Sequence, residues 1–239
     1  GYLKKDQRSN ESSLKYVIYG AFSSGLMLFG LSILFGLTGT TKFFEIQNAL
    51  AGLDTSSHFA LIIASIFILA GFGYKISAVP FHFWTPDVYE GAPTPVTAYL
   101  SVAPKAAGFA LLIRFFHVVF TDAGLLLESG NGISTIPWPQ VLAGISVATM
   151  TLGNLVAIQQ SSVKRMLAYS SIAHAGYMLM AMPILSGNGV FAIMIYLVMY
   201  LFMNLGAFFV VIVVKNKTGG ETFEDFRGLG WEMPLVGIV

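Results

Sequence analysis

The chain has no cysteine and few charged residues. Among its 239 residues only 10% are Asp, Glu, Lys or Arg, whereas 55% are hydrophobic, and the mean hydropathy is +0.73. Without cysteine the chain can form neither disulfide bonds nor thiolate metal sites, and thiol catalysis is excluded. A soluble domain of this size has roughly 25% charged residues with which to cover its surface. The composition therefore predicts a protein that lies in a lipid bilayer.

The sequence also lacks the signals of several other functional classes. Its net charge is only +1 and it has no basic patch interleaved with aromatic residues, so a nucleic-acid partner is not expected. It has no HExxH motif, paired catalytic carboxylates or phosphate-binding loop, so we expect no metal or cofactor site in this chain. The first 15 residues are polar and do not form a signal peptide. Because the chain begins without Met and ends within the apolar run VGIV, we expect it to be a fragment of a longer protein.

Long apolar segments are the main feature of the sequence. A membrane-spanning helix needs about 20 mostly apolar residues, and six windows reach that length. Transmembrane strands would instead be short and would alternate in hydrophobicity, whereas these windows are continuously apolar. We therefore predict one all-α membrane domain over residues 1–239, with six complete spans and a seventh that begins near Pro234. The six windows are Tyr16–Thr38, Phe59–Val79, Val96–Phe120, Pro139–Gln160, Met166–Leu185 and Gly189–Val214.

The basic residues outside the spans are divided unevenly between the two sides of this predicted bundle. One side contains only Lys42. The other side contains Lys4, Lys5, Arg8, Lys15, Lys164, Arg165, Lys215, Lys217 and Arg227. Because loops rich in Lys and Arg stay in the cytoplasm, the sequence predicts that the N-terminal side faces the cytoplasm or its topological equivalent.

Three basic residues lie inside the predicted spans. Arg114 is about six residues, or roughly 9 Å, from the end of its span, and its long side chain can reach the lipid headgroups. Lys105 lies close to the bilayer midplane, where a lysine costs roughly 2.5–3.5 kcal/mol. Such a residue should face the protein interior or water. A role in moving protons or ions is the favoured interpretation of Lys105, and a structural ion pair is the alternative.

Lys75 precedes a predicted break in its helix. Pro80 has no N–H, so the carbonyl of Ile76 is expected to lose its helical donor. Interrupted membrane helices occur where the freed backbone lines a cavity or a binding site, which favours a transport role for Lys75. The alternative is an ordinary helix end followed by an aromatic belt at the membrane interface. Farther along this segment, Asp87 and Glu90 are expected to be solvated or to cap a helix.

A second proline and a histidine complete the candidate site. Pro104 directly precedes Lys105 and is expected to free the carbonyl of Leu100 in the same way. His174 lies in the fifth predicted span, within SSIAHAGYM, among small residues that allow close helix packing. A histidine can transfer protons near neutral pH, and a hydrogen bond to a neighbouring serine is the alternative. We take Lys75, Lys105 and His174 as the candidate functional residues.

The most distinctive segment of the chain is AVPFHFWTPDVYEGAPTPVTAYLSVAPKAAGFALLIRFF. Together with GNLVAIQQSSVKRMLAYSSIAHAGYML, MYLFMNLGAFFVV and ETFEDFRGLGWEMP, it resembles the antiporter-like membrane subunits of respiratory complex I. The related L and M subunits typically carry a histidine motif where this chain has SVAPKAAG, and PDA where it has PDVYEGAP. Within the family, the chain therefore resembles subunit N, called subunit 2 in mitochondria and chloroplasts.

This resemblance implies a fold of two inverted five-helix repeats, each with one broken helix. It implies that Lys75 is the channel lysine at the first broken helix and that Lys105 is the central lysine on the next helix. It further implies a glutamate partner on a helix before Tyr16 and another lysine after Val239, both outside this chain.

The resemblance also implies a function, partners and a location. The whole protein would be a proton-translocating subunit of an NADH–quinone or ferredoxin–quinone oxidoreductase. It would lie in the bacterial inner membrane, or in a thylakoid or mitochondrial inner membrane, and its partners would be lipid and the other membrane subunits of complex I. NADH or ferredoxin, FMN, iron–sulfur clusters and quinone are expected in partner subunits and not in this chain.

Two other functions remain open from the sequence. The first is a stand-alone cation/proton antiporter subunit, whose transport would depend on sodium. The second is a non-conducting membrane scaffold, whose buried lysines would only form ion pairs.

Overall fold

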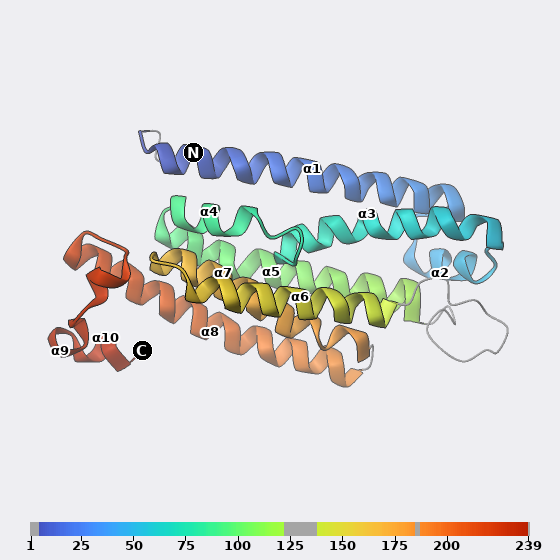
Figure 1. Ribbon diagram of the computed structural model, residues 1–239. Coiled ribbons are helices and arrows are strands. Elements are labelled where there is room, and N and C mark those ends of the chain that lie inside the picture. The colour runs from blue at the N-terminus through green and yellow to red at the C-terminus, as the bar shows by residue number, and fades with distance from the viewer. Residues whose placement is uncertain (1–4, 122–137, 185–186, 239) are drawn as a thin grey trace.

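The computed structural model describes residues 5–121, 138–184 and 187–238, and the regular elements within these ranges are helices. The long helices and α4 lie side by side with roughly parallel axes (Figure 1). They are α1 (Gln7–Thr38), α3 (His58–Ile76), α4 (Trp84–Gly91), α5 (Thr94–Phe116), α6 (Trp138–Ile158), α7 (Val163–Leu179) and α8 (Gly187–Thr218). Shorter elements are α2 (Phe43–Ala51), α9 (Leu229–Glu232), α10 (Pro234–Ile238), the 3-10 turns η1 (Thr55–Ser57), η3 (Met182–Ile184) and η4 (Phe223–Phe226), and the π-helical turn η2 (His117–Thr121). The predicted all-α helical bundle is confirmed.

Successive passes through the bundle alternate in direction (Figure 1). The second pass consists of α3 and α4 in sequence, separated by a break. The start of α1, the end of α4, the start of α7 and the end of α8 lie at one end of the bundle, which we call the basic end, whereas α2 lies at the other. Lys15, Lys164 and Lys215 are therefore at the basic end, and Lys42 is opposite, as the sequence predicts; Lys4 is outside the described residues. Which end faces the cytoplasm stays a prediction.

Five helices are long and apolar enough to cross a membrane. They are α1, α3, α5 extended to Val119, α6 and α8, and they coincide with five of the six predicted windows. The remaining window forms α7, which has only 17 residues and is followed by the turn η3. Its predicted last residue, Leu185, is outside the described residues. The count of six spans therefore stays a prediction, as does the start of a seventh at Pro234, where α10 begins.

Helix α1 begins at Gln7, nine residues earlier than its apolar window. The side chain of Asp6 accepts a hydrogen bond from the backbone N–H of Arg8 at 3.0 Å and so caps the helix. The polar first turns are also held from outside, because Ser12 donates to the backbone carbonyl of Asp87 on α4 at 2.7 Å. Hydropathy reports where a helix enters lipid, whereas capping decides where the helix starts.

Small residues allow α6 and α7 to pack closely. A Cβ atom at Gly153 would lie 2.6 Å from the backbone nitrogen of Ala173, and one at Gly176 would lie 2.7 Å from the backbone nitrogen of Met150. A side chain at either glycine would therefore push the two helices apart. This contact fixes the position of α7, which carries the central residues of the candidate site.

The outward faces of the bundle are apolar. Only 17% of the most apolar window of α1 and 28% of that of α8 are buried within the protein. Large side chains such as Phe22, Phe29, Phe202 and Phe209 are exposed along these helices. Such surfaces are stable in lipid and not in water. Arg114, in the last turn of α5, is also exposed, as expected for a side chain that reaches the headgroups.

Candidate functional site

The second pass through the bundle is broken between α3 and α4. Helix α3 ends at Ile76, and Ser77 follows in a left-handed conformation with a φ of 63°, donating its backbone N–H to the carbonyl of Tyr74. The peptide bond before Pro80 is cis. The predicted break is present, but the helix has already ended four residues before Pro80. The expectation that Pro80 itself removes the helical donor of Ile76 is therefore corrected.

Polar groups around the break are bound by neighbouring side chains. The backbone N–H of Val79 donates to Oγ1 of Thr149 on α6 at 3.1 Å. The indole Nε1 of Trp84, the first residue of α4, donates to the carbonyl of Tyr74 at 3.0 Å. Because buried backbone groups without partners are costly, these bonds stabilise the break as a fixed part of the structure.

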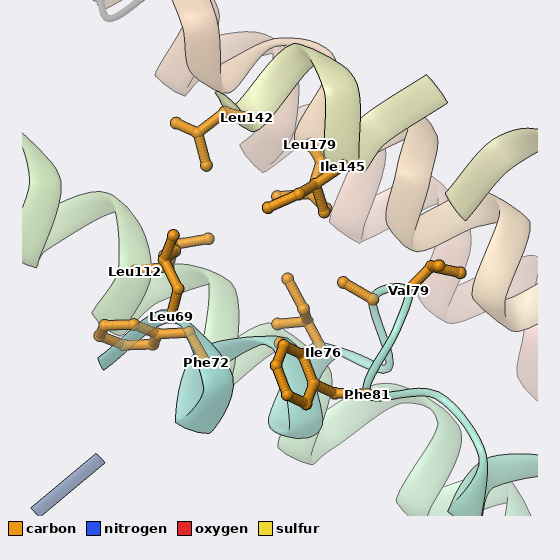
Figure 2. A pocket seen from close by; sticks show the side chains of 11 residues that line it. Leu69, Phe72, Ile76, Val79, Phe81, Leu112, Leu142, Ile145 and Leu179 are labelled. Atoms are coloured by element: carbon orange, nitrogen blue, oxygen red, sulfur yellow. The ribbon is translucent and has the colours of Figure 1, made fainter. Parts of the chain in front are cut away.

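A small apolar cavity lies beside the break. Figure 2 shows Ile76, Val79 and Phe81 from the broken segment facing Leu112, Ile145 and Leu179 from α5, α6 and α7. Its free volume is about 30 Å³. A water would fit by volume, but a buried water needs two to four polar partners, and the lining side chains are all apolar. This cavity is therefore a packing gap and not a route for protons.

Lys75 is exposed on the surface of the described part of the protein. It lies in the last turn of α3, and its stem passes α5, because a Cβ atom at Gly108 would lie 3.3 Å from its Cγ. Gly108 is one helical turn beyond Lys105. The structure thus places the stem of Lys75 against the helix that carries Lys105, but it does not bury Lys75.

Lys105, by contrast, is fully buried, with 1% of its surface exposed. Its Nζ donates to the backbone carbonyl of Ser171 on α7 at 2.8 Å and to the Oγ atom of the same residue. No carboxylate within the described ranges forms an ion pair with it. The ion-pair alternative therefore finds no partner among the residues that the structure describes.

Hydroxyl groups from three helices meet at Ser171, the partner of the Lys105 ammonium. The Oγ atom of Ser171 is 2.6 Å from the hydroxyl of Tyr200 on α8 and 3.3 Å from the hydroxyl of Tyr89 on α4. The Tyr200 hydroxyl also donates to the carbonyl of Ser101 on α5 at 3.3 Å. We call these five residues the hydroxyl cluster; its members are Tyr89, Ser101, Lys105, Ser171 and Tyr200.

Pro104 does not break its helix. Helix α5 continues from Thr94 to Phe116 with Pro104 inside it. The helix therefore does not break at Pro104, although Pro104 has no N–H to donate to the carbonyl of Leu100. A proline inside a membrane helix is tolerated when neighbouring groups compensate for the lost backbone bond.

His174 lies one turn from Ser171 on α7. Its Nδ1 is 2.6 Å from the hydroxyl of Tyr196 on α8, so its partner is a tyrosine and not the serine considered from the sequence. Its ring centroid is 5.3 Å from that of Tyr200. His174 is also close enough to Lys105 for the two groups to interact electrostatically. The structure thus brings His174 and Lys105 together, whereas Lys75 lies outside this cluster.

A stripe of hydroxyl groups runs along α5 from the basic end to Lys105. Thr94, Thr97 and Ser101 are buried, and their spacing of three and four residues places them on the same helix face as Lys105. Oγ1 of Thr94 donates to Oε1 of Glu221 at 3.2 Å, beyond the end of α8. The spacing of these residues is visible in TPVTAYLSVAPK, so the stripe could have been predicted from the sequence but was not.

Ion pairs join α4 to the rest of the basic end. Asp87 bonds Lys15 of α1 at 2.6 Å and Arg165 of α7 at 2.7 Å, and Arg165 also bonds Glu90 at 2.9 Å. The expectation that Asp87 and Glu90 are merely solvated or capping groups is therefore wrong. Their partners come from distant parts of the chain, which sequence spacing could not reveal.

Lys164 is as deeply buried as Lys105, which was not expected of a loop charge. Its Nζ donates to the carbonyls of Glu90 and Ala92 at 3.0 and 2.7 Å. These carbonyls lie at the end of α4, where the last turn of a helix has no internal donors. Nζ is also 3.7 Å from Oε1 of Glu221, which pairs with Lys215 at 2.8 Å.

The segment after α8 folds back to complete this end. Thr222 pairs with Ser162 in an isolated bridge, and its hydrogen bonds to Asp225 cap η4 and hold the pKa of the Asp225 carboxyl below its usual range. A polar cavity of about 440 Å³ lies between this segment and α4, with Lys164 and Glu221 in its wall. Within the described residues, no group of three His, Cys, Asp or Glu side chains could hold a metal ion.

The whole chain, residues 1–239, matches the model of a protein family described as "NADH:quinone oxidoreductase/Mrp antiporter, TM". The chain belongs to this family. It is 53% identical over 237 residues to NADH-quinone oxidoreductase subunit N of Chlorobium chlorochromatii, a match that covers 99% of this chain and 45% of that protein. The subunit N of Anaeromyxobacter sp. is 51% identical over 246 residues, covering 100% and 48%. The chain thus spans about half the length of these relatives.

Solved structures show the same fold. A chain of the membrane-bound sulfane sulfur reductase, an archaeal respiratory membrane complex, matches with a TM-score of 0.84 and 26% identity over 99% of this chain and 46% of that one. A chain of respiratory complex I from Thermus thermophilus matches with a TM-score of 0.74 and 32% identity, covering 98% and 47%. The resemblance to the antiporter-like subunits of complex I is confirmed, and the protein is an integral membrane protein.

Proposed function

We propose that the full-length protein is subunit N of an NADH–quinone or ferredoxin–quinone oxidoreductase and that it translocates protons through Lys75, Lys105 and His174. Relatives of this name at about 50% identity support the first part. They also favour it over a stand-alone antiporter. The observation that carries the second part is the buried Lys105 ammonium, which has hydroxyl and carbonyl partners and no carboxylate in the described residues.

These partners suit a group that changes its charge. Burial disfavours a charged lysine, and an approaching carboxylate favours it. A second lysine acts in the opposite direction: two lysine charges about 7 Å apart repel by about 2.4 kcal/mol at an effective dielectric constant near 20. The stem of Lys75 lies one turn from Lys105 along α5. A change in the charge of Lys75 would therefore help to load or to empty Lys105.

The redox chemistry belongs to partner subunits in this proposal. NADH or ferredoxin, FMN, iron–sulfur clusters and quinone would be bound there, and this chain would hold none of them. Its own partners would be lipid, protons and the other membrane subunits. Electron transfer would reach it as a change in the electrostatics or conformation of its neighbours.

Substitution of Lys105 tests the relay. Lys105→Met removes the ammonium, and with it a burial cost of roughly 2.5–3.5 kcal/mol, whereas Lys105→Arg keeps a charge that does not readily release its proton. We expect both variants of the full-length subunit to assemble and to lower proton uptake in vesicles at least tenfold, normalised to subunit content. A scaffold role predicts the opposite: Arg would restore function and Met would weaken assembly. Full pumping by the Arg variant would refute the relay.

A further inference from the structure

Ser171 is the point at which the hydroxyl cluster converges. Its Oγ atom contacts Nζ of Lys105 and the hydroxyls of Tyr89 and Tyr200. A serine hydroxyl has one proton to donate and two lone pairs that accept. Three partners therefore use its whole capacity, and a change in direction of one bond forces a change in another.

With Lys105 charged, one arrangement satisfies every member of the hydroxyl cluster. An ammonium only donates, so Ser171 accepts from Lys105 and must give its own proton to a tyrosine. Tyr200 is the better acceptor, because its own proton can go to the carbonyl of Ser101. Within the described residues the only hydrogen-bond partner of the Tyr89 hydroxyl is Ser171, so Tyr89 donates to Ser171.

With Lys105 neutral, the amine has a lone pair that needs a donor. Leaving a buried acceptor unpaired is costly, and the Ser171 hydroxyl is the donor within reach. If Ser171 turns its proton towards Lys105, it can no longer donate to Tyr200. Tyr200 then donates to Ser171 and releases the Ser101 carbonyl, while Tyr89 keeps the same role in both states.

We propose that Ser171 is a positioning residue that transmits the charge of Lys105 to Tyr200, so that the Tyr200–Ser101 hydrogen bond forms when Lys105 is charged and opens when Lys105 is neutral. The proposal rests on the proposed function of Lys105 as a proton relay. It assigns different roles to two tyrosines that touch the same serine: Tyr200 supports only the charged state, and Tyr89 supports both states equally.

Two other titratable groups lie near Lys105 or beside its helix and must be held constant. They are His174 on α7, which interacts electrostatically with Lys105, and Lys75 on α3, whose stem lies beside Gly108. Tyr200 and Tyr89 themselves come from α8 and α4. Both phenylalanine variants below leave His174 and Lys75 in place, so a difference between these variants does not arise from them.

The test uses the full-length subunit in its assembled complex, reconstituted in vesicles, with the matched variants Tyr200→Phe and Tyr89→Phe. Each variant loses one hydroxyl that bonds Ser171. Tyr200→Phe leaves the Ser171 proton without its acceptor when Lys105 is charged, and so disfavours the charged state. In a plot of proton uptake against pH, the alkaline limb should therefore move to lower pH by about one unit. Tyr89→Phe should move it by less than about 0.3 unit. Equal shifts, no shift in either variant, or a larger shift for Tyr89→Phe would overturn the proposal.

A double-mutant cycle separates this effect from general damage to the structure. Because Tyr200 acts through Ser171, the variant Ser171→Ala/Tyr200→Phe should shift no further than Ser171→Ala alone. Ser171→Thr keeps a hydroxyl and should restore the alkaline limb to its wild-type position. Additive shifts in the double variant, or no restoration by Ser171→Thr, would overturn the proposal.

The Lys105 variants distinguish a failure of the Lys105 relay from a failure of the role of Ser171. If Lys105→Arg pumps fully, the relay itself fails; if the Lys105 variants do not pump but the tyrosine variants shift equally, only the role of Ser171 fails.

Discussion

Two lysines in this protein are equally buried but have different surroundings. Lys164, at the basic end, is held by two backbone carbonyls and a nearby carboxylate. Lys105, at the centre, is held by one carbonyl and by a serine whose hydroxyl can turn. The groups around the Lys164 ammonium only accept, because carbonyls and carboxylates never donate. Lys105 has a partner for each of its charge states. Burial alone therefore does not distinguish the two lysines, whereas the donor and acceptor types around each ammonium do.

The largest effect on stability is expected at Lys164. Lys164→Met should leave the carbonyl of Glu90 without a donor and that of Ala92 with only the long bond from the Thr97 hydroxyl at 3.5 Å, and should destabilise the subunit by about 2–4 kcal/mol. Lys105→Met should not destabilise the subunit in this way, because the Ser171 carbonyl lies inside α7 and has a helical partner. Thermal unfolding of the full-length subunit and its content in assembled complex measure both. Equal losses for the two Met variants would remove the distinction between the lysines.

A smaller effect is expected where α4 is held by ion pairs. Asp87→Asn keeps the size of the side chain and weakens the bonds to Lys15 and Arg165. These groups are about 30% exposed, so the loss should be about 1–2 kcal/mol. It should grow smaller with added salt, because salt screens exposed pairs. Thermal unfolding at low and high salt checks this. A loss of stability as large as that of Lys164→Met would show that the ion pairs of Asp87, and not the capping bonds of Lys164, fix α4.

The smallest effect is expected at Asp225, outside the spans. Its folded pKa is lowered by the hydrogen bonds from Thr222, so its contribution is present above the unfolded pKa and is lost as the pH falls through the lower folded value. Asp225→Asn should raise protease cleavage of residues 219–226 at neutral pH, with little effect on assembly. Acidification should raise cleavage of the wild type towards that of the variant. Unchanged cleavage would show that the bridge to Ser162 holds this segment without the cap.

The sequence was sufficient for features that depend on local composition. Continuous apolar runs predicted the helices, and the position of Lys105 within its run predicted its burial. The face formed by Thr94, Thr97 and Ser101 was equally readable from spacing. The break after Ile76 was predicted from Pro80, but the helix already ends at Ser77, whose left-handed conformation no local pattern signals.

Features that depend on contacts between distant segments were not predictable. The Ser171 hydroxyl meets Tyr89 and Tyr200 only because α4, α7 and α8 pack around α5. Lys164 was counted as a loop charge because its burial requires the segment after α8 to fold back over it. In both cases the partners are many residues away in the chain, and periodicity within one helix contains no information about them.

The position of Lys105 along α5 also has an electrical consequence. It is the twelfth of the 23 residues of this helix, so a proton loaded onto it in the proposed relay would have crossed about half of the insulating layer. Moving one elementary charge across the whole membrane potential changes its energy by about 2.3 kcal/mol per 100 mV. Loading Lys105 therefore involves roughly half of this, about 1.2 kcal/mol per 100 mV. The occupancy of this lysine should respond to voltage, as well as to the pH on the side from which it is loaded.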